Sequence, residues 1–184
     1  VPTESTAPQT VEPIDYAGSL ELDMESATIK QEVTVKNFVD GDTTHFYVPT
    51  SIRDTGVLKA RYLAVNTPES TGKIEEWGKK ASNFTKGKLL EAESIYIESD
   101  NDKWNVDSTG DRHTVWVWYK PAGAADYRCL NLELVQEGLS IACGTVEDRY
   151  GVEASAAFQQ AKRESLLEFA RRMRQALDTV DPRI

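Results

Sequence analysis

Two neighbouring stretches decide the fold: VTVKNFVDGDTTHFYV at residues 33–48 and VLKARYLAVNTPE at residues 57–69. Apolar residues in both recur at nearly every second position, which is the period of a half-buried β-strand. The Asp-Gly-Asp sequence at residues 40–42 predicts a tight turn within the first stretch, and residues 53–56 predict a second turn before the next strand. Three strands joined by short turns predict a β-meander.

The rest of the chain adds further strands and three helices. The third strand is predicted at residues 57–65 and is ended by Pro68. Residues 75–90 predict a helix because their apolar side chains fall near one face. Strands are predicted at residues 94–98 and 113–119 with a shorter one at 127–130, and helices at 132–136 and 153–177. Five short strands with a helix after the third favour an α+β, mainly β, fold: a five-stranded Greek-key β-barrel of the OB type with three helices.

Length and composition indicate one globular domain. The chain has 184 residues, of which 40% are hydrophobic and 28% charged, so a sizeable core is possible. No apolar run approaches the roughly 20 residues that cross a bilayer, so we expect no membrane-spanning segment. The sequence starts at Val1 rather than Met, and we therefore expect that it lacks an N-terminal segment, for which a signal peptide and a lipid anchor are the open alternatives.

Acidic residues gather at the start of the chain. The formal net charge is −9, but residues 1–27 hold six acidic residues and no Lys or Arg, which leaves about −3 for the rest. Prolines among Ser, Thr and Glu predict a solvated tail or linker at residues 1–27, with the folded domain at residues 28–184. A near-neutral domain permits a local basic groove and excludes a protein that coats DNA. Such a tail suits a secreted or cell-surface anchored bacterial protein, and we expect that location, although any disordered tail has the same composition.

Cys129 and Cys143 are the only cysteines, and their separation matches no metal-ligand spacing. We interpret them as small buried hydrophobic residues, with a disulfide as the open alternative. They therefore say little about the redox compartment.

Polar residues cluster where the predicted strands end. Arg61 shares a strand face with Leu63 and Val65, and an arginine among aliphatic neighbours is costly unless it meets an anion. The same strand ends in three oxygen donors, Asn66, Thr67 and Glu69. Hard cations such as calcium prefer ligands of this kind, although a solvated strand end has the same composition.

Several of these motifs, in this order, resemble the staphylococcal nuclease (thermonuclease) family. The resemblance covers about residues 30 to 170 and rests on DGDT at 40–43, RYLAVNTPE at 61–69, WGKKASNFTK at 77–86, Gly110 with Arg112 before a strand, NLELVQEGL at 131–139 and AKRE at 161–164. It implies an OB-type barrel that hydrolyses phosphodiester bonds of DNA or RNA and uses one calcium ion. It also implies a nucleic acid partner, for which we favour a single strand, and we expect a monomer.

The resemblance implies which residues would hold the metal. Asp42 and Asn66 would bind calcium through their side chains, and Thr67 through its backbone carbonyl. Asp40 would support the metal site from just outside it.

The resemblance also implies a catalytic set of three residues. Glu69 would orient or deprotonate the attacking water, while Arg61 and Arg112 would grip the phosphate and stabilise the charge of its transition state. A non-catalytic OB-type binding or scaffold module is the alternative, but such a module would be expected to lose these three residues.

The chain departs from the family at several positions. Asn66 stands where active members usually have Asp, and the missing charge predicts weaker calcium binding. The family's nucleotide-stacking tyrosines have no counterpart at the matching positions, near Thr109 and at Gly144 and Val146. Tyr150 and Trp104 are the candidate substitutes, although plain loop aromatics are the alternative interpretation of both. Asp111 directly precedes Arg112, and its carboxylate would weaken the attraction for phosphate.

Overall fold

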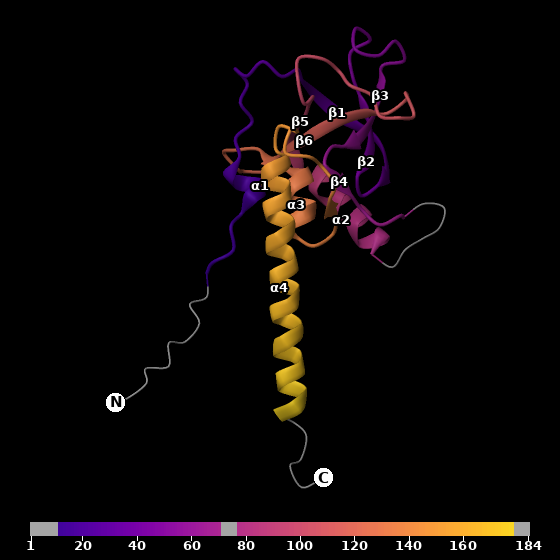
Figure 1. Ribbon diagram of the computed structural model, residues 1–184. Helices are drawn as coiled ribbons and strands as arrows, with labels where there is room; N and C mark the ends of the chain where they lie inside the picture. Colours follow the sequence, from indigo (N-terminus) through magenta and orange to yellow (C-terminus); the bar gives the residue numbers. More distant parts are fainter. Residues whose placement is uncertain (1–10, 71–76, 179–184) are drawn as a thin grey trace.

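The computed structural model describes residues 11–70 and 77–178, and five of its strands close into a barrel (Figure 1). These strands are β1 (Lys30–Asp40), β2 (Thr43–Tyr47), β3 (Val57–Tyr62), β5 (Ala92–Glu98) and β6 (His113–Pro121). They pair antiparallel in the order β3-β2-β1-β5-β6, and a parallel contact between β3 and β6 closes the ring. The prediction of an α+β, mainly β, five-stranded barrel is thereby confirmed.

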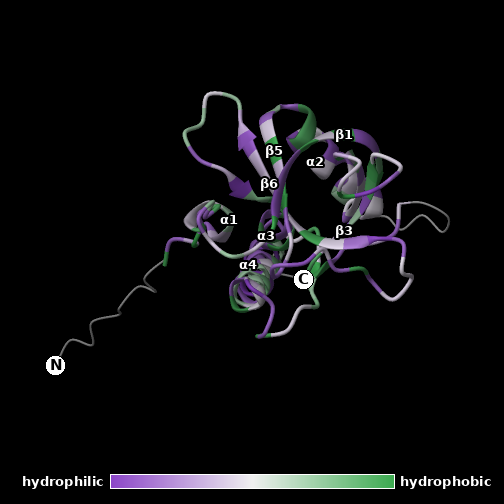
Figure 2. Cartoon of the chain, turned by 90° about the horizontal axis from the view of Figure 1, so that it is seen from above, coloured by the Kyte–Doolittle hydropathy of each residue, from purple (hydrophilic) through white to green (hydrophobic). Residues whose placement is uncertain are grey.

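Short elements and helices surround this barrel. The helices are α1 (Tyr16–Ser19), α2 (Gly78–Leu90), α3 (Leu130–Gln136) and α4 (Gly151–Asp178), and the short strands are β4 (Val65–Asn66), β7 (Arg128–Cys129) and β8 (Ile141–Ala142). The described residues thus contain one short helix, α1, beyond the three predicted. The long helix α4 runs away from the barrel, and α1 and α3 lie beside its first turns (Figure 1). The view along α4 shows the same two helices next to it (Figure 2). No helix in the described part of the chain is long and apolar enough to cross a membrane.

The central strand β6 is buried on both of its faces. Val115 and Val117 point into the barrel and pack with Phe46, Leu58 and residues of α3. Because side chains alternate along a strand, the intervening Trp116 points to the opposite face. There it joins a second apolar cluster that lies against the start of α4. This double burial makes β6 a rigid platform for the residues at its start.

The third predicted strand is interrupted, contrary to the expectation of one strand over residues 57–65. β3 ends at Tyr62, and Ala64 has a positive φ of 62°. The guanidinium of Arg61 donates to the carbonyl oxygens of both Tyr62 (3.0 Å) and Val65 (2.9 Å). The bend brings both carbonyls within reach of one side chain. Alternating hydrophobicity did not reveal it because Ala64 and Val65 are apolar in either geometry.

Part of the predicted N-terminal linker packs on the domain. Ala17 of α1 is fully buried, and Asp15 makes two hydrogen bonds with the guanidinium of Arg128, at 2.7 and 2.9 Å. Gln136 also contacts this segment, because its amide oxygen accepts from the backbone N–H of Ala17. The solvated linker predicted from composition is therefore wrong for this short segment, whereas residues 1–10 lie outside the described part.

Only one of the two cysteines matches the prediction that both are buried. Cys129 is buried as expected, whereas Cys143 is exposed, and neither forms a disulfide. Full burial raises the pKa of the Cys129 thiol, and partial desolvation raises the pKa of the Cys143 thiol. Both are therefore protonated near neutral pH.

Candidate active site

The turn between β1 and β2 is wedged against α2. A Cβ atom added to Gly41 would lie 2.8 Å from the Cβ of Ala81 and 3.0 Å from side-chain atoms of Thr67. The hydroxyl of Thr85 in α2 donates to the carbonyl oxygen of Gly41 at 2.6 Å. This close approach requires a glycine, and it fixes the position of the next residue, Asp42.

Asp42 is a buried carboxylate with several polar partners. Its side chain accepts hydrogen bonds from the hydroxyl of Thr43 (3.0 Å) and from the backbone N–H of Thr67 (2.8 Å). It also forms an ion pair with Arg61, with 3.2 Å between Oδ2 and Nη1. The anion that Arg61 was expected to meet is therefore, in this structure, Asp42.

Arg61 lies between the two predicted metal-binding side chains. Its Nη1 contacts Asp42, and its Nη2 donates to the amide oxygen Oδ1 of Asn66 at 3.1 Å. The two hydrogen bonds to carbonyl oxygens at the bend after β3 hold the same guanidinium in place. A side chain with this many acceptors has little rotational freedom, so the group is fixed before any ligand arrives.

Thr67 contains a buried hydroxyl without a partner. Its Oγ1 is inaccessible to solvent and has no hydrogen-bond partner among the described residues. A buried hydroxyl without a partner costs free energy, and such atoms commonly mark a place where a ligand or water binds. This one belongs to the residue whose backbone is bonded to Asp42.

The donors gathered here are all oxygen atoms. Asp42 contributes a carboxylate, Asn66 an amide oxygen, and Thr67 a carbonyl and the unpartnered hydroxyl. This donor chemistry suits a hard cation such as calcium. In the described residues no group of three or more His, Cys, Asp or Glu side chains could hold a metal. The set fits calcium in its chemistry, but with a single carboxylate that already faces Arg61.

Glu69 follows in a segment that is anchored at two places. Asp40 accepts hydrogen bonds from the backbone N–H (3.1 Å) and the hydroxyl of Ser70. A Cβ atom on Gly78, at the start of α2, would lie only 2.0 Å from the carbonyl oxygen of Glu69. The backbone of Glu69 is thus pressed against the helix while its side chain is exposed. Asp40 supports this neighbouring segment.

Arg112 directly precedes β6, which lies beside the strand that carries Arg61. The parallel pairing of β3 with β6 places Arg61 next to Thr114, two residues after Arg112. Both arginines therefore lie at the same end of the barrel. The structure gives no direct contact between them among the described residues.

The carboxylate that competes for Arg112 is Asp107. The Nε of Arg112 donates to Asp107 at 2.6 Å. Asp111 instead forms ion pairs with Lys59 (2.6 Å) and Arg53 (3.7 Å). The geometry therefore favours Asp107, rather than Asp111, as the carboxylate that weakens the attraction of Arg112 for phosphate.

The proposed substitutes for the family's stacking tyrosines lie elsewhere. Tyr150 is buried edge-on against Trp116 and Trp118, and its hydroxyl contacts the buried carboxylate of Glu98. Burial raises its pKa, so the phenol stays protonated. Trp104 is partly buried against the main core. Both residues therefore support the fold.

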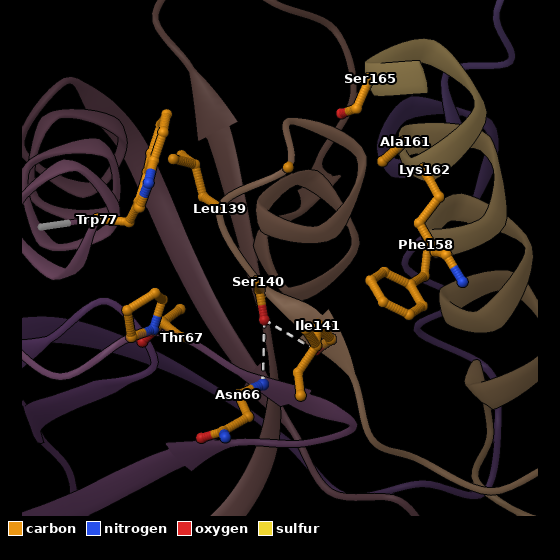
Figure 3. Close-up of a pocket in the computed structure, with 12 residues that line it drawn as sticks. Asn66, Thr67, Trp77, Leu139, Ser140, Ile141, Phe158, Ala161, Lys162 and Ser165 are labelled. Atoms are coloured by element: carbon orange, nitrogen blue, oxygen red, sulfur yellow. Dashed lines mark hydrogen bonds between the residues drawn. The ribbon is translucent and has the colours of Figure 1, made fainter. Parts of the chain in front are cut away.

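The sequence interpretation missed a cavity of about 530 Å³ next to Asn66 and Thr67. Trp77 and Phe158 line it from opposite sides, as Figure 3 shows. Trp77 and Phe158 fall within the predicted helices at residues 75–90 and 153–177, where an apolar side chain is ordinarily interpreted as core. Only the half-exposed ring of Trp77, with 50% of its surface accessible, distinguishes it from a core residue.

The fold and these contacts define an OB-type barrel with an arginine and oxygen-donor site at one end. The family model of the staphylococcal nuclease homologues matches residues 59–167, which is more than half of the chain. The chain therefore belongs to the staphylococcal nuclease homologue family, as its motifs predicted. The match includes Arg61, Asn66 and Arg112 but begins after Asp42, whose place in the site follows from its contacts. No curated protein matches the chain.

Proposed function

We propose that this chain is a calcium-dependent nuclease that hydrolyses phosphodiester bonds of DNA or RNA. Membership of the family supports nuclease activity. The observation that carries the proposal is the convergence of Asp42, Arg61 and Thr67, which reach one place from three segments of the chain.

Arg61 would stabilise the charge that develops on the phosphate. A planar guanidinium matches two phosphate oxygens, and phosphoryl transfer depends mainly on positioning and electrostatic stabilisation. Because its carbonyl partners already hold Arg61 in place, little reorganisation would be needed when substrate binds. Arg112, at the same end of the barrel, would be the second side chain that binds the phosphate.

Glu69 would serve as the general base. In the step that we propose, its carboxylate takes a proton from water and the oxygen of that water attacks phosphorus. One phosphorus–oxygen ester bond breaks, and the leaving oxygen takes up a proton from solvent. Calcium, when held by Asp42, Asn66 and Thr67, would polarise a phosphoryl oxygen and offset its charge. The exposed side chain of Glu69 is able to meet a solvent molecule.

A non-catalytic nucleic-acid-binding module is the second candidate. The ion pairs of Arg61 with Asp42 and of Arg112 with Asp107 partly neutralise both arginines. Asn66 further lowers the charge available for a metal. These features favour weak chemistry, whereas the presence of Glu69 with both arginines favours an enzyme.

One experiment separates the two candidates. Wild type and Glu69→Gln are incubated with single-stranded DNA and with RNA, each in calcium and in chelator. Cleavage that needs calcium and is lost in Glu69→Gln supports the nuclease. Absence of cleavage by wild type at every calcium concentration would leave only the binding module.

We also propose a secreted or surface-anchored bacterial location. Support comes from the acidic, Pro- and Thr-containing start of the sequence. A weak calcium site also suits the calcium-rich exterior of cells, since affinity follows ligand charge. Detection of the protein in the medium or on intact cells tests this location.

A further inference from the structure

A cavity of about 530 Å³ opens directly beside the candidate active site. Its volume lies within the range of pockets that bind small molecules, about 300–1,000 Å³. Asn66 and Thr67 line the cavity and also belong to the proposed metal site. A group bound in the cavity would therefore be adjacent to the phosphate held at Arg61.

The walls of the cavity carry two aromatic rings and one cation, Lys162. Trp77 borders it just before α2, and Phe158 borders it from α4 (Figure 3). The Nζ of Lys80 lies 3.7 Å from the ring centroid of Trp77, and the Nζ of Lys162 lies 5.4 Å from that of Phe158. Each ring thus has a lysine ammonium group next to it, of which Lys162 lines the cavity and Lys80 lies outside its lining.

The floor of the cavity is tied to the active site. The hydroxyl of Ser140 accepts a hydrogen bond from the backbone N–H of Asn66 at 3.0 Å and donates to the carbonyl oxygen of Ile141 at 2.9 Å (Figure 3). β4 and β8 pair through the same residues. The distance between the cavity and the candidate site is therefore set by the backbone.

We propose that this cavity binds an unpaired base of the same nucleic acid strand whose phosphate is held by Arg61. The inference rests on the proposed function and adds a binding site for the base. Bases of single strands stack on aromatic side chains irrespective of sequence, and lysines beside the rings attract the flanking phosphates. A base inside a duplex is already stacked and paired, so it would have to be extruded first. The cavity therefore selects single strands.

Binding without cleavage tests this inference. A labelled single-stranded oligonucleotide is titrated in chelator with wild type, Trp77→Ala and Phe158→Ala, and anisotropy is recorded. Loss of one stacked base predicts affinity about 5- to 100-fold weaker for the variants. Trp77→Phe should retain most of the affinity but should lose the quenching of tryptophan emission by the oligonucleotide. Tyr47→Ala serves as the matched control, because Tyr47 is 52% exposed and lies outside the cavity lining.

A second oligonucleotide, without bases, shows whether the cavity recognises the base or the phosphates. An oligonucleotide with the same phosphates but abasic residues should bind wild type and Trp77→Ala equally. Equal weakening of normal and abasic strands would overturn the inference, because the ring would then act through the phosphates or the fold. Unchanged binding of the normal strand by both alanine variants would also overturn it.

The outcomes distinguish this inference from the proposed nuclease activity. Base-dependent binding at Trp77 without any cleavage would support the cavity and refute the enzyme. Cleavage by wild type, together with single-strand affinity that is unchanged in Trp77→Ala and Phe158→Ala, would support the enzyme and refute the cavity. Thermal unfolding of each variant, compared with wild type, shows that an altered affinity does not come from a damaged fold.

Discussion

Arg61 and Asp42 form an ion pair at the centre of the candidate site, with 3.2 Å between Nη1 and Oδ2. The same guanidinium donates to Asn66. A phosphate and a metal ion would thus approach residues that already neutralise each other. How strongly the site binds phosphate and metal therefore depends on how far Arg61 and Asp42 neutralise each other.

Arg61→Lys should strongly impair cleavage. An ammonium group has no planar fork, so it cannot contact Asp42, Asn66 and a phosphate together. By analogy with a lost transition-state donor, we expect kcat/KM to fall about 10²- to 10³-fold. Arg53→Lys, at an ion pair outside the candidate site, should leave kcat/KM nearly unchanged. Equal rates for Arg61→Lys and wild type would remove Arg61 from the catalytic set.

Asn66→Asp should strengthen calcium binding. A second carboxylate adds a charge to a site that holds only Asp42, and we expect about tenfold tighter binding by calorimetric titration. Asn83→Asp adds the same net charge at an exposed position of α2 and should have little effect. If the Asn66→Asp variant binds calcium no more tightly than wild type, the charge argument is wrong.

Asp107→Asn should improve phosphate binding by Arg112. Burial on its own would raise the pKa of Asp107, but hydrogen bonds from Thr109 and Arg112 lower it on balance, so the carboxylate is charged at neutral pH. Removing this charge should strengthen oligonucleotide binding in chelator by a few fold. Asp111→Asn removes an equal charge from Lys59 instead and should give the smaller effect. A larger gain for Asp111→Asn would contradict the geometry.

Gly78→Ala should displace Glu69. The added methyl group would lie 2.0 Å from the carbonyl oxygen of Glu69, so the segment must move. We expect kcat to fall and the free energy of unfolding to drop by about 1–3 kcal/mol, as for other overpacked sites. Gly87→Ala in the same helix has no heavy atom within 4 Å and should stabilise the protein by about 0.5–1 kcal/mol. Urea unfolding and initial rates measure both variants, and full activity in Gly78→Ala would disprove the displacement.

Asp15→Asn should destabilise the protein in a pH-dependent way. The hydrogen bond from Arg128 is the largest cause that lowers the pKa of Asp15 to about 2. Because the folded-state pKa is depressed, the stabilisation is present above the ordinary value of 3.8 and is lost as pH falls through about 2. The carboxylate is half exposed, so we expect at most about 1 kcal/mol.

Urea unfolding of wild type and Asp15→Asn at several pH values tests this expectation. The difference should be constant near neutral pH and should shrink between about pH 4 and 2. A difference that stays constant down to pH 2 would show that Asp15 does not act through its charge.

Several local patterns were sufficient to predict the barrel and its family. Alternating apolar residues placed the strands, and the Asp-Gly-Asp turn at residues 40–42 lies between β1 and β2 as expected. Such signals can be recognised in sequence because they depend on neighbours along the chain. The exception was Ala64, where a bend broke a continuous apolar run. The docking of Asp15 on Arg128 was also missed, since composition does not report a distant partner.

The sequence by itself determined the residue types of the candidate site: one carboxylate at a glycine turn, two arginines at strand positions and a group of oxygen donors before Glu69. Only the tertiary structure decided that Arg61 faces Asp42, that Arg112 pairs with Asp107, and that Trp77 stands opposite Phe158. The physical reason is that strand and helix periods define the face on which a side chain lies. The closure of the barrel and the packing of α2 and α4 define which side chain it meets.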